Sequence, residues 1–221
     1  MAVYDLEEQE QLDELKTWWK QYGNLVTSLV TALAVVAVGW QGWNWWQRNQ
    51  AAQAAALYGG IEKAASVRNV KQARDFAGEL IDKYPRTAQA AMGALLSAKV
   101  QVEGGDAKNA RSQLQWAADN ATDDALRSLA KLRLAALLLD DKAYDEALKQ
   151  IPADTASPFA ARFGEVKGDI LVAQGKTVEA RAAYEAALQQ LDKQTKDDAA
   201  GQARAYREIV QAKLDTLGAA K

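Results

Sequence analysis

Hydrophobic and polar positions divide this chain into two regions. Residues 25–46 contain no charged side chain and lie between Lys20 and Arg48, whereas charged residues recur through the rest of the chain. From residue 51 onward alanine and leucine dominate and β-branched runs are scarce, which favours helices by intrinsic propensity. The pattern predicts an all-α chain, with one transmembrane helix over 25–46 and a helical domain over 51–221.

Residues 25–46 have the length of a membrane span. As an α-helix they would reach about 33 Å, close to the hydrocarbon thickness of a bilayer. Two alternatives are the buried helix of a soluble domain and a cleaved signal peptide, although an acidic leader of 24 residues is atypical of signal peptides. Tryptophans suit a membrane interface because indole is largely apolar but carries an N–H. The predicted interface anchors are Trp40, Trp43, Trp45 and Trp46.

The first 24 residues form a separate amphipathic segment. Leu12, Leu15, Trp19 and Tyr22 share one helical face, and the other face is acidic. Because anionic headgroups attract basic residues, docking onto another protein is favoured over lipid binding. The alternative is a partly ordered leader without a partner.

An internal repeat runs through residues 51–221. The alanines that would open the second helix of successive helical hairpins are separated by 37, 37 and 33 residues: Ala73, Ala110, Ala147 and Ala180. These separations bracket the 34-residue period of tetratricopeptide repeats, which are stacked pairs of antiparallel helices. The last unit is the clearest, although Lys167 stands where that family usually has a leucine. We therefore expect a tetratricopeptide-like solenoid of about four hairpins; a generic alanine-rich bundle is the alternative.

Residues that favour helix ends separate the expected helices. Gly105 and Gly175 suit C-terminal positions with positive φ. Asp123 or its predecessor and Ser157 are predicted N-caps, the latter with Pro158 at the first helical position. A final amphipathic helix is expected to cap the open end of the stack. Its apolar face would hold Ala203, Tyr206, Ile209, Val210, Lys213, Leu214 and Leu217.

The first helices of the hairpins are expected to line a protein-binding groove, as the resemblance to tetratricopeptide repeats implies. A mostly apolar groove suits an extended or helical apolar segment of another protein. The candidate residues are Tyr58, Met92, Leu95, Lys99, Leu129, Leu132, Leu139, Asp169 and Val172, with Glu62 beside them. For Leu129 and Leu132 above all, the alternative is a place in the core.

Composition removes several classes of chemistry. The chain has no cysteine and no histidine, so it lacks a thiol nucleophile, the usual base near neutral pH and the usual ligands of transition metals. We expect no cofactor and no metal. A net charge of −2 without a basic stripe gives no surface for nucleic acid. A carboxylate-dependent hydrolase is a weaker alternative, because the pairs 123–124 and 140–141 suit a helix N-terminus and a turn.

Four segments carry a resemblance that covers nearly the whole chain. They are the acidic leader 5–14, the stretch 15–22 with its paired Trp18 and Trp19, the glycine- and tryptophan-containing exit 39–45, and the sequence 175–184. In this order they resemble the YfgM-like ancillary subunits of the bacterial Sec translocon. The resemblance implies a single-pass inner-membrane protein with a cytoplasmic N-terminus, a periplasmic repeat domain and no catalytic activity.

The same resemblance implies the partners. They would be the SecYEG translocon, a membrane-anchored periplasmic chaperone and exported client proteins. Charge does not decide the orientation, since Lys16 and Lys20 precede the span while Arg48 and Lys63 follow it. A membrane-tethered scaffold for envelope or cell-wall assembly is an alternative that would have the same anchor and repeats.

Overall fold

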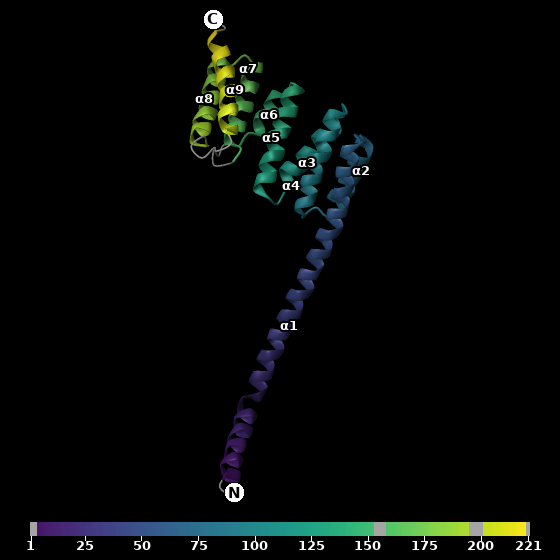
Figure 1. Cartoon of the computed structure of the whole chain (residues 1–221), viewed down its shortest axis with the longest axis vertical. Helices are drawn as coiled ribbons and strands as arrows, with labels where there is room; N and C mark the ends of the chain where they lie inside the picture. Colours follow the sequence, from purple (N-terminus) through teal and green to yellow (C-terminus); the bar gives the residue numbers. More distant parts are fainter. Residues whose placement is uncertain (1–3, 153–157, 195–200, 220–221) are drawn as a thin grey trace. The chain divides into compact units, whose positions relative to one another are not determined.

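The computed structural model describes residues 4–152, 158–194 and 201–219, and all regular structure within these ranges is helical. The chain divides into two compact units, residues 1–50 and residues 51–221. Helix α1 (Tyr4–Ser66) contributes to both units, so its two parts are described separately. Figure 1 shows the order of the helices along the chain.

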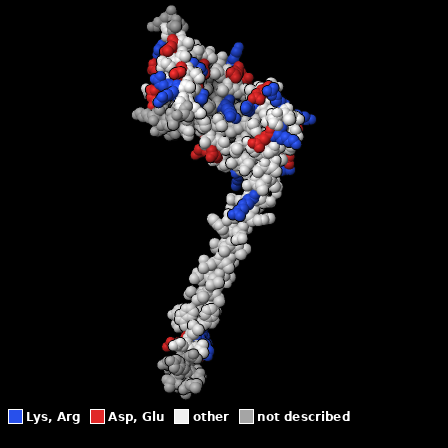
Figure 2. Space-filling model, viewed as in Figure 1, with Lys and Arg blue, Asp and Glu red and all other residues white. Residues whose placement is uncertain are grey.

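The first unit consists of the part of α1 before residue 51. It contains the one stretch of the described chain that is long and apolar enough, by length and composition, to cross a membrane. Figure 2 shows a length of this helix without Lys, Arg, Asp or Glu. The hydroxyls of Thr27 and Thr31 each donate to a backbone carbonyl one turn back, at 2.7 Å. They therefore need no water partner, which suits an apolar surrounding.

The second unit consists of four helical hairpins and a final helix. The end of α1 pairs with α2 (Val70–Lys83), α3 (Ala88–Glu103) with α4 (Ala107–Asn120), and α5 (Asp124–Asp140) with α6 (Tyr144–Lys149). Helix α7 (Ala160–Ala173) then pairs with α8 (Thr177–Gln194), and α9 (Gln202–Ala219) packs against α8. This arrangement confirms the predicted all-α class, with about four hairpins and a capping helix.

Each hairpin closes with the same turn. A residue with positive φ lies five positions before the packing alanine, and it is Arg68, Gly105, Lys142 or Gly175 in successive hairpins. In all four, the N–H of the next residue donates to a carbonyl five residues back at 2.8 Å. This is the Schellman arrangement that ends a helix. Gly105 and Gly175 confirm the predicted positive φ, and two non-glycine residues adopt it as well.

Small residues hold the two helices of a hairpin close together. Ala73, Ala110, Ala147 and Ala180 are all fully buried. In the last hairpin, a Cβ added at Gly168 would lie 2.3 Å from a ring carbon of Tyr184. Because such a contact is far inside van der Waals range, only glycine fits at residue 168 without displacing Tyr184.

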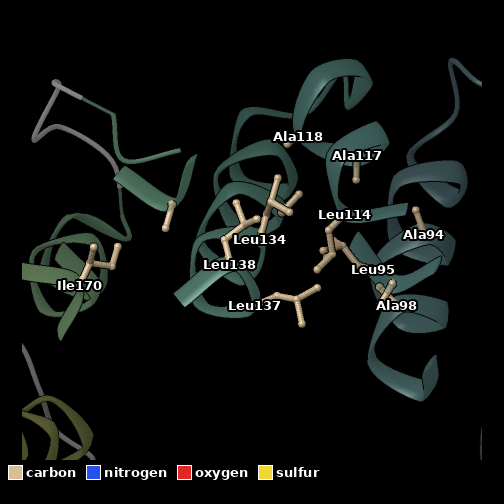
Figure 3. Packing of buried hydrophobic residues seen from close by; sticks show 13 residues of the cluster. Ala94, Leu95, Ala98, Leu114, Ala117, Ala118, Leu134, Leu137, Leu138 and Ile170 are labelled. Carbon is tan, nitrogen blue, oxygen red and sulfur yellow. The ribbon is translucent and has the colours of Figure 1, made fainter. Parts of the chain in front are cut away.

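The largest core cluster joins neighbouring hairpins. Leu114, Leu134 and Leu138 are buried between α3, α4 and α5 (Figure 3). Ile170 of α7 is a fully buried member of the same cluster, so it links the third hairpin to the fourth. Separate clusters lie between the first hairpin and α3, and around α8 and α9. Stacking buries apolar faces that a single hairpin would leave in water.

Side-chain caps begin the early helices. The backbone N–H of Leu126 donates to the Asp123 carboxylate at 2.8 Å, which confirms Asp123 as an N-cap. Helix α7 begins at Ala160 without a side-chain cap, so the prediction that Pro158 is its first residue is wrong. Ser157, the predicted cap, lies outside the described residues.

Candidate protein-binding surface

The predicted groove residues occupy equivalent positions on the first helices of successive hairpins. We call their exposed and half-buried members the first-helix face. Met92 and Val172 are 39% and 41% exposed, and Lys99 is exposed as well. Four members are half-buried: Tyr58, Leu129, Leu132 and Leu139. Of these, Leu129 and Leu139 also pack against the largest core cluster.

Leu95 belongs to the core instead of the surface. Its side chain is only 4% exposed and packs with α4 and α5 residues of the largest cluster (Figure 3). In addition, the Arg133 guanidinium donates to the Leu95 carbonyl at 3.3 Å. The sequence-based assignment of Leu95 to the groove is therefore wrong, because the stacking of the next hairpin covers its side of α3.

Val102 is a surface residue that the sequence analysis missed. It is 45% exposed. Leu139 follows it by 37 residues, and Val172 follows Leu139 by 33 residues, which are the separations of the repeat. The signal was present in the spacing, since residues 102, 139 and 172 occupy the same position of successive first helices. Val102, Leu139 and Val172 thus place one aliphatic side chain in the last turn of each of α3, α5 and α7, and we include Val102 in the first-helix face.

Asp169 is engaged within the chain. Its carboxylate accepts a hydrogen bond from the Tyr184 hydroxyl at 2.7 Å and binds the Lys213 ammonium at 2.7 Å. The same ammonium binds Glu165 at 2.8 Å, and Glu165 also accepts a hydrogen bond from the Tyr206 hydroxyl. We call these five residues the cap cluster. It ties α9 to α7 and occupies Asp169, which is therefore not free for a partner.

Arg162 extends the cap cluster. Its guanidinium lies 3.4 Å from the centre of the Tyr206 ring and 3.9 Å from a Glu165 carboxylate oxygen. A cation over an aromatic ring is attracted by the negative face of the ring. Arg162 thus adds a second positive charge beside Glu165, which is 9% exposed.

Burial and hydrogen bonding shift three pKa values in the cap cluster. Desolvation, and then the hydrogen bond to Asp169, raise the pKa of Tyr184 well above its ordinary value. Desolvation and the hydrogen bond to Glu165 do the same to the pKa of Tyr206. For Lys213, burial lowers the pKa, but hydrogen bonds to Asp169 and Glu165 outweigh it and raise the pKa overall. The cluster is therefore built for a charged lysine and two neutral tyrosines at neutral pH.

The polar members at the other end of the face have local partners. Lys99 lies 3.8 Å from Glu103 in an exposed pair one turn apart. Burial, and then the nearby charge of Glu62, raise the pKa of Tyr58. These side chains remain accessible at the surface, so they give the first-helix face a polar border beside its aliphatic residues.

The acidic pairs considered for catalysis have structural surroundings. Asp123 caps α5, and Asp124 binds Arg127 at 2.7 Å in an exposed pair. Asp140 and Asp141 are exposed at the end of α5, where Asp141 is the C-cap. Neither pair lines a described pocket. The carboxylates that do converge, Glu165 and Asp169, share the ammonium of Lys213.

The tryptophans of the first unit are exposed along α1. Trp40, Trp43, Trp45 and Trp46 are between 48% and 70% exposed, and the rings of Trp43 and Trp46 lie 5.4 Å apart. At the other end of the uncharged stretch, the Trp18 ring lies 5.8 Å from that of Tyr22. Aromatic residues thus flank both ends of the uncharged stretch, as in helices that meet two membrane interfaces.

An apolar helix with aromatic ends and a stack of small-residue hairpins define the class of a membrane-anchored repeat protein. The family model of the tetratricopeptide repeat-like domain matches residues 16–219. A relative in Neisseria gonorrhoeae (strain ATCC 700825 / FA 1090) is 32% identical over 98% of this chain and 100% of its own length.

Two further relatives carry the same name. The protein of Haemophilus influenzae (strain ATCC 51907 / DSM 11121 / KW20 / Rd) is 33% identical over 85% of this chain and 91% of its own length. That of Escherichia coli (strain K12) is 26% identical over 85% and 90%. All three relatives are named ancillary SecYEG translocon subunit. The chain belongs to this family of tetratricopeptide repeat-like proteins.

Proposed function

We propose that this protein is an ancillary subunit of the Sec translocon that works by binding other proteins. In this proposal residues 1–24 are a cytoplasmic segment, residues 25–46 cross the inner membrane, and residues 51–221 form a periplasmic interaction domain. The name shared by the relatives supports attachment to SecYEG. The uncharged length of α1 and its two aromatic ends support the anchor.

The observation that carries the binding role is the row of aliphatic side chains on the first-helix face. Val102 and Val172 are more than two-fifths exposed, and Met92 is nearly so. Exposed apolar side chains in register favour an apolar segment of another polypeptide, because docking removes them from water. An unbranched methionine adapts to segments of different shape. The proposed ligands are exported proteins that emerge unfolded and a membrane-anchored periplasmic chaperone.

The anchor allows such binding to be weak. A domain tethered beside the exit of a channel meets emerging chains at a high effective concentration. Modest affinity then gives high occupancy without slow release, which suits a protein that must let its clients go. The few exposed aliphatic side chains of the first-helix face are consistent with modest affinity.

Site-specific photocrosslinking in intact cells tests the proposal. The full-length chain would carry a photoreactive phenylalanine at Val102 or Val172, and at Val67 as a control that is 67% exposed but lies in the turn after α1. We expect positions 102 and 172 to crosslink to translocon subunits, the chaperone or exported chains, and position 67 to give far less. Equal products at all three positions would reject the first-helix face.

Two further measurements separate binding from location. Val102→Asp combined with Val172→Asp should reduce crosslinking from a third probe at Met92, because charge opposes apolar docking. Protease added to spheroplasts should digest the repeat domain while the inner membrane is intact. Protection of that domain until the membrane is opened would reverse the proposed orientation without affecting the binding surface.

A further inference from the structure

The second helix of the third hairpin is much shorter than its counterparts. Helix α6 has 6 residues, whereas α2 and α4 have 14 each. Proline at position 152 explains the early end, since it has no N–H to continue the helix and disfavours helical geometry at Ile151. At about 1.5 Å per residue, α6 lacks a length of roughly 12 Å.

In the earlier hairpins, this part of the second helix covers the next hairpin. Leu80, in the last turn of α2, lies against α3 so closely that a Cβ at Gly93 would be 2.7 Å from it. Ala117 and Ala118, near the end of α4, are buried in the cluster that includes α5 residues. The chain itself therefore shows what fits this face of a hairpin, namely an α-helix with small or aliphatic side chains.

Within the described residues, no second helix continues over the corresponding face of α7 beyond the short α6. A surface pocket of about 550 Å³ runs along α7 and α8, next to Ile151 and Pro152 at the end of α6. Phe163, Leu171 and Ala183 form its buried floor, and Ala182 and Ala186 are exposed apolar residues on its wall. The pocket lies on α7 and α8 and shares none of the residues of the first-helix face.

Lys167 gives this pocket a charge preference. Residues 97, 134 and 167 occupy the same repeat position, and Ser97 and Leu134 are both fully buried, whereas Lys167 is exposed and lines the pocket. Lys176 also lines the pocket, and among the described residues neither Lys167 nor Lys176 forms an ion pair. Glu179 is the acidic residue of the lining. The border of the pocket thus carries a net positive charge.

We propose that this pocket docks an amphipathic α-helix of another protein. The partner helix would supply the length that α6 lacks, with small apolar side chains toward Ala182 and Ala186 and an Asp or Glu beside Lys167. The apolar contacts would provide affinity by removing the exposed alanines of the pocket from water, and the carboxylate would set the orientation. This site is distinct from the first-helix face and would allow a fixed partner and a transient client to bind together.

A pair of synthetic helical peptides tests the proposal with the full chain in detergent micelles. Both are 14-residue amphipathic peptides with an alanine and leucine stripe, one flanked by glutamates and the other by lysines, and each carries a fluorescent label for anisotropy. We expect saturable binding of the glutamate peptide, and on the order of five- to tenfold weaker binding to Lys167→Glu. The lysine peptide should show the opposite preference. Binding to the micelle is the same for all chain variants, so differences report the pocket.

Two exposed alanines provide matched variants. Ala186→Glu places a charge in the pocket and should abolish binding of the glutamate peptide, whereas Ala205→Glu, on α9, should leave it unchanged. Helix content by circular dichroism confirms that each variant is folded. Equal binding of both peptides, or no effect of Lys167→Glu, would overturn the proposal. A doubling of mass that Ala186→Glu abolishes would assign the pocket to a second copy and would also overturn it.

Discussion

Replacing Lys213 by methionine should release α9 from the rest of the domain. The ammonium of Lys213 contacts Glu165 at 2.8 Å and Asp169 at 2.7 Å, and the two carboxyl side chains are only 12% and 27% exposed. Methionine keeps most of the aliphatic volume but leaves two negative charges one helical turn apart on α7. The substitution therefore tests the charge and not the packing.

The expected loss follows from the burial of the partners. Removing one member of a fully buried ion pair costs about 3–5 kcal/mol, because the other charge stays buried without compensation. Here the lysine side chain is 34% exposed and Arg162 remains near Glu165, so we expect about 2–3 kcal/mol. That is a rise of roughly 30- to 150-fold in the opening of α9, since 1.4 kcal/mol corresponds to a factor of ten.

Amide hydrogen exchange of the full chain in detergent micelles measures this opening directly. Exchange should accelerate in α9 and remain unchanged in α3, because repeat proteins open locally. Lys99→Met is the matched control, since its pair with Glu103 is 3.8 Å long and more than half exposed on both sides. It should cost about 0.3–0.5 kcal/mol. Exchange of α9 in Lys213→Met within twofold of Lys99→Met would refute the reasoning.

Three further predictions concern the repeats and their cap. Lys142→Gly should stabilise the third hairpin by about 0.5–1 kcal/mol, because the φ of 59° at this position strains any residue with a Cβ. Gly105→Ala should destabilise the second hairpin by a similar amount for the same reason. Chemical denaturation measures both effects. Gly168→Ala should cost about 1–3 kcal/mol of stability through the clash with Tyr184. Gly78→Ala, with open space at its Cβ, should instead stabilise α2. A loss of stability at both positions would contradict the packing argument. The pKa of Tyr206 is raised in the folded state, so its contribution to the stability of the fold is complete below the ordinary tyrosine pKa near 10 and is lost as pH rises above it. Proteolysis of α9 should therefore increase less steeply at high pH in Tyr206→Phe than in the unaltered chain.

The sequence predicted the repeat because the packing alanines and the turn glycines are local requirements. Each hairpin needs a small residue where its helices cross, and these positions appear at a fixed period. The positive φ of Arg68 and Lys142 could not be predicted from composition, because lysine and arginine disfavour that geometry. The Schellman turn that joins the two helices of each hairpin places them in it.

The surface was less predictable than the core. Leu95 and Leu139 look alike in the sequence, yet one is buried by the next hairpin and the other is only half-buried. The role of Asp169 was also hidden, because Lys213 lies 44 residues further along the chain. Contacts of this range depend on how the last helix folds back, and periodicity in a single sequence does not report it.

The early end of α6 also determines how the domain responds to force. The second helices of the first two hairpins have 14 residues each, whereas the third hairpin meets the fourth through the short α6 and through buried residues such as Ile170. When a bound chain is pulled, the strain should concentrate at this junction. The terminal hairpin and α9 would then swing as one piece, and the array would yield there before any helix unravels.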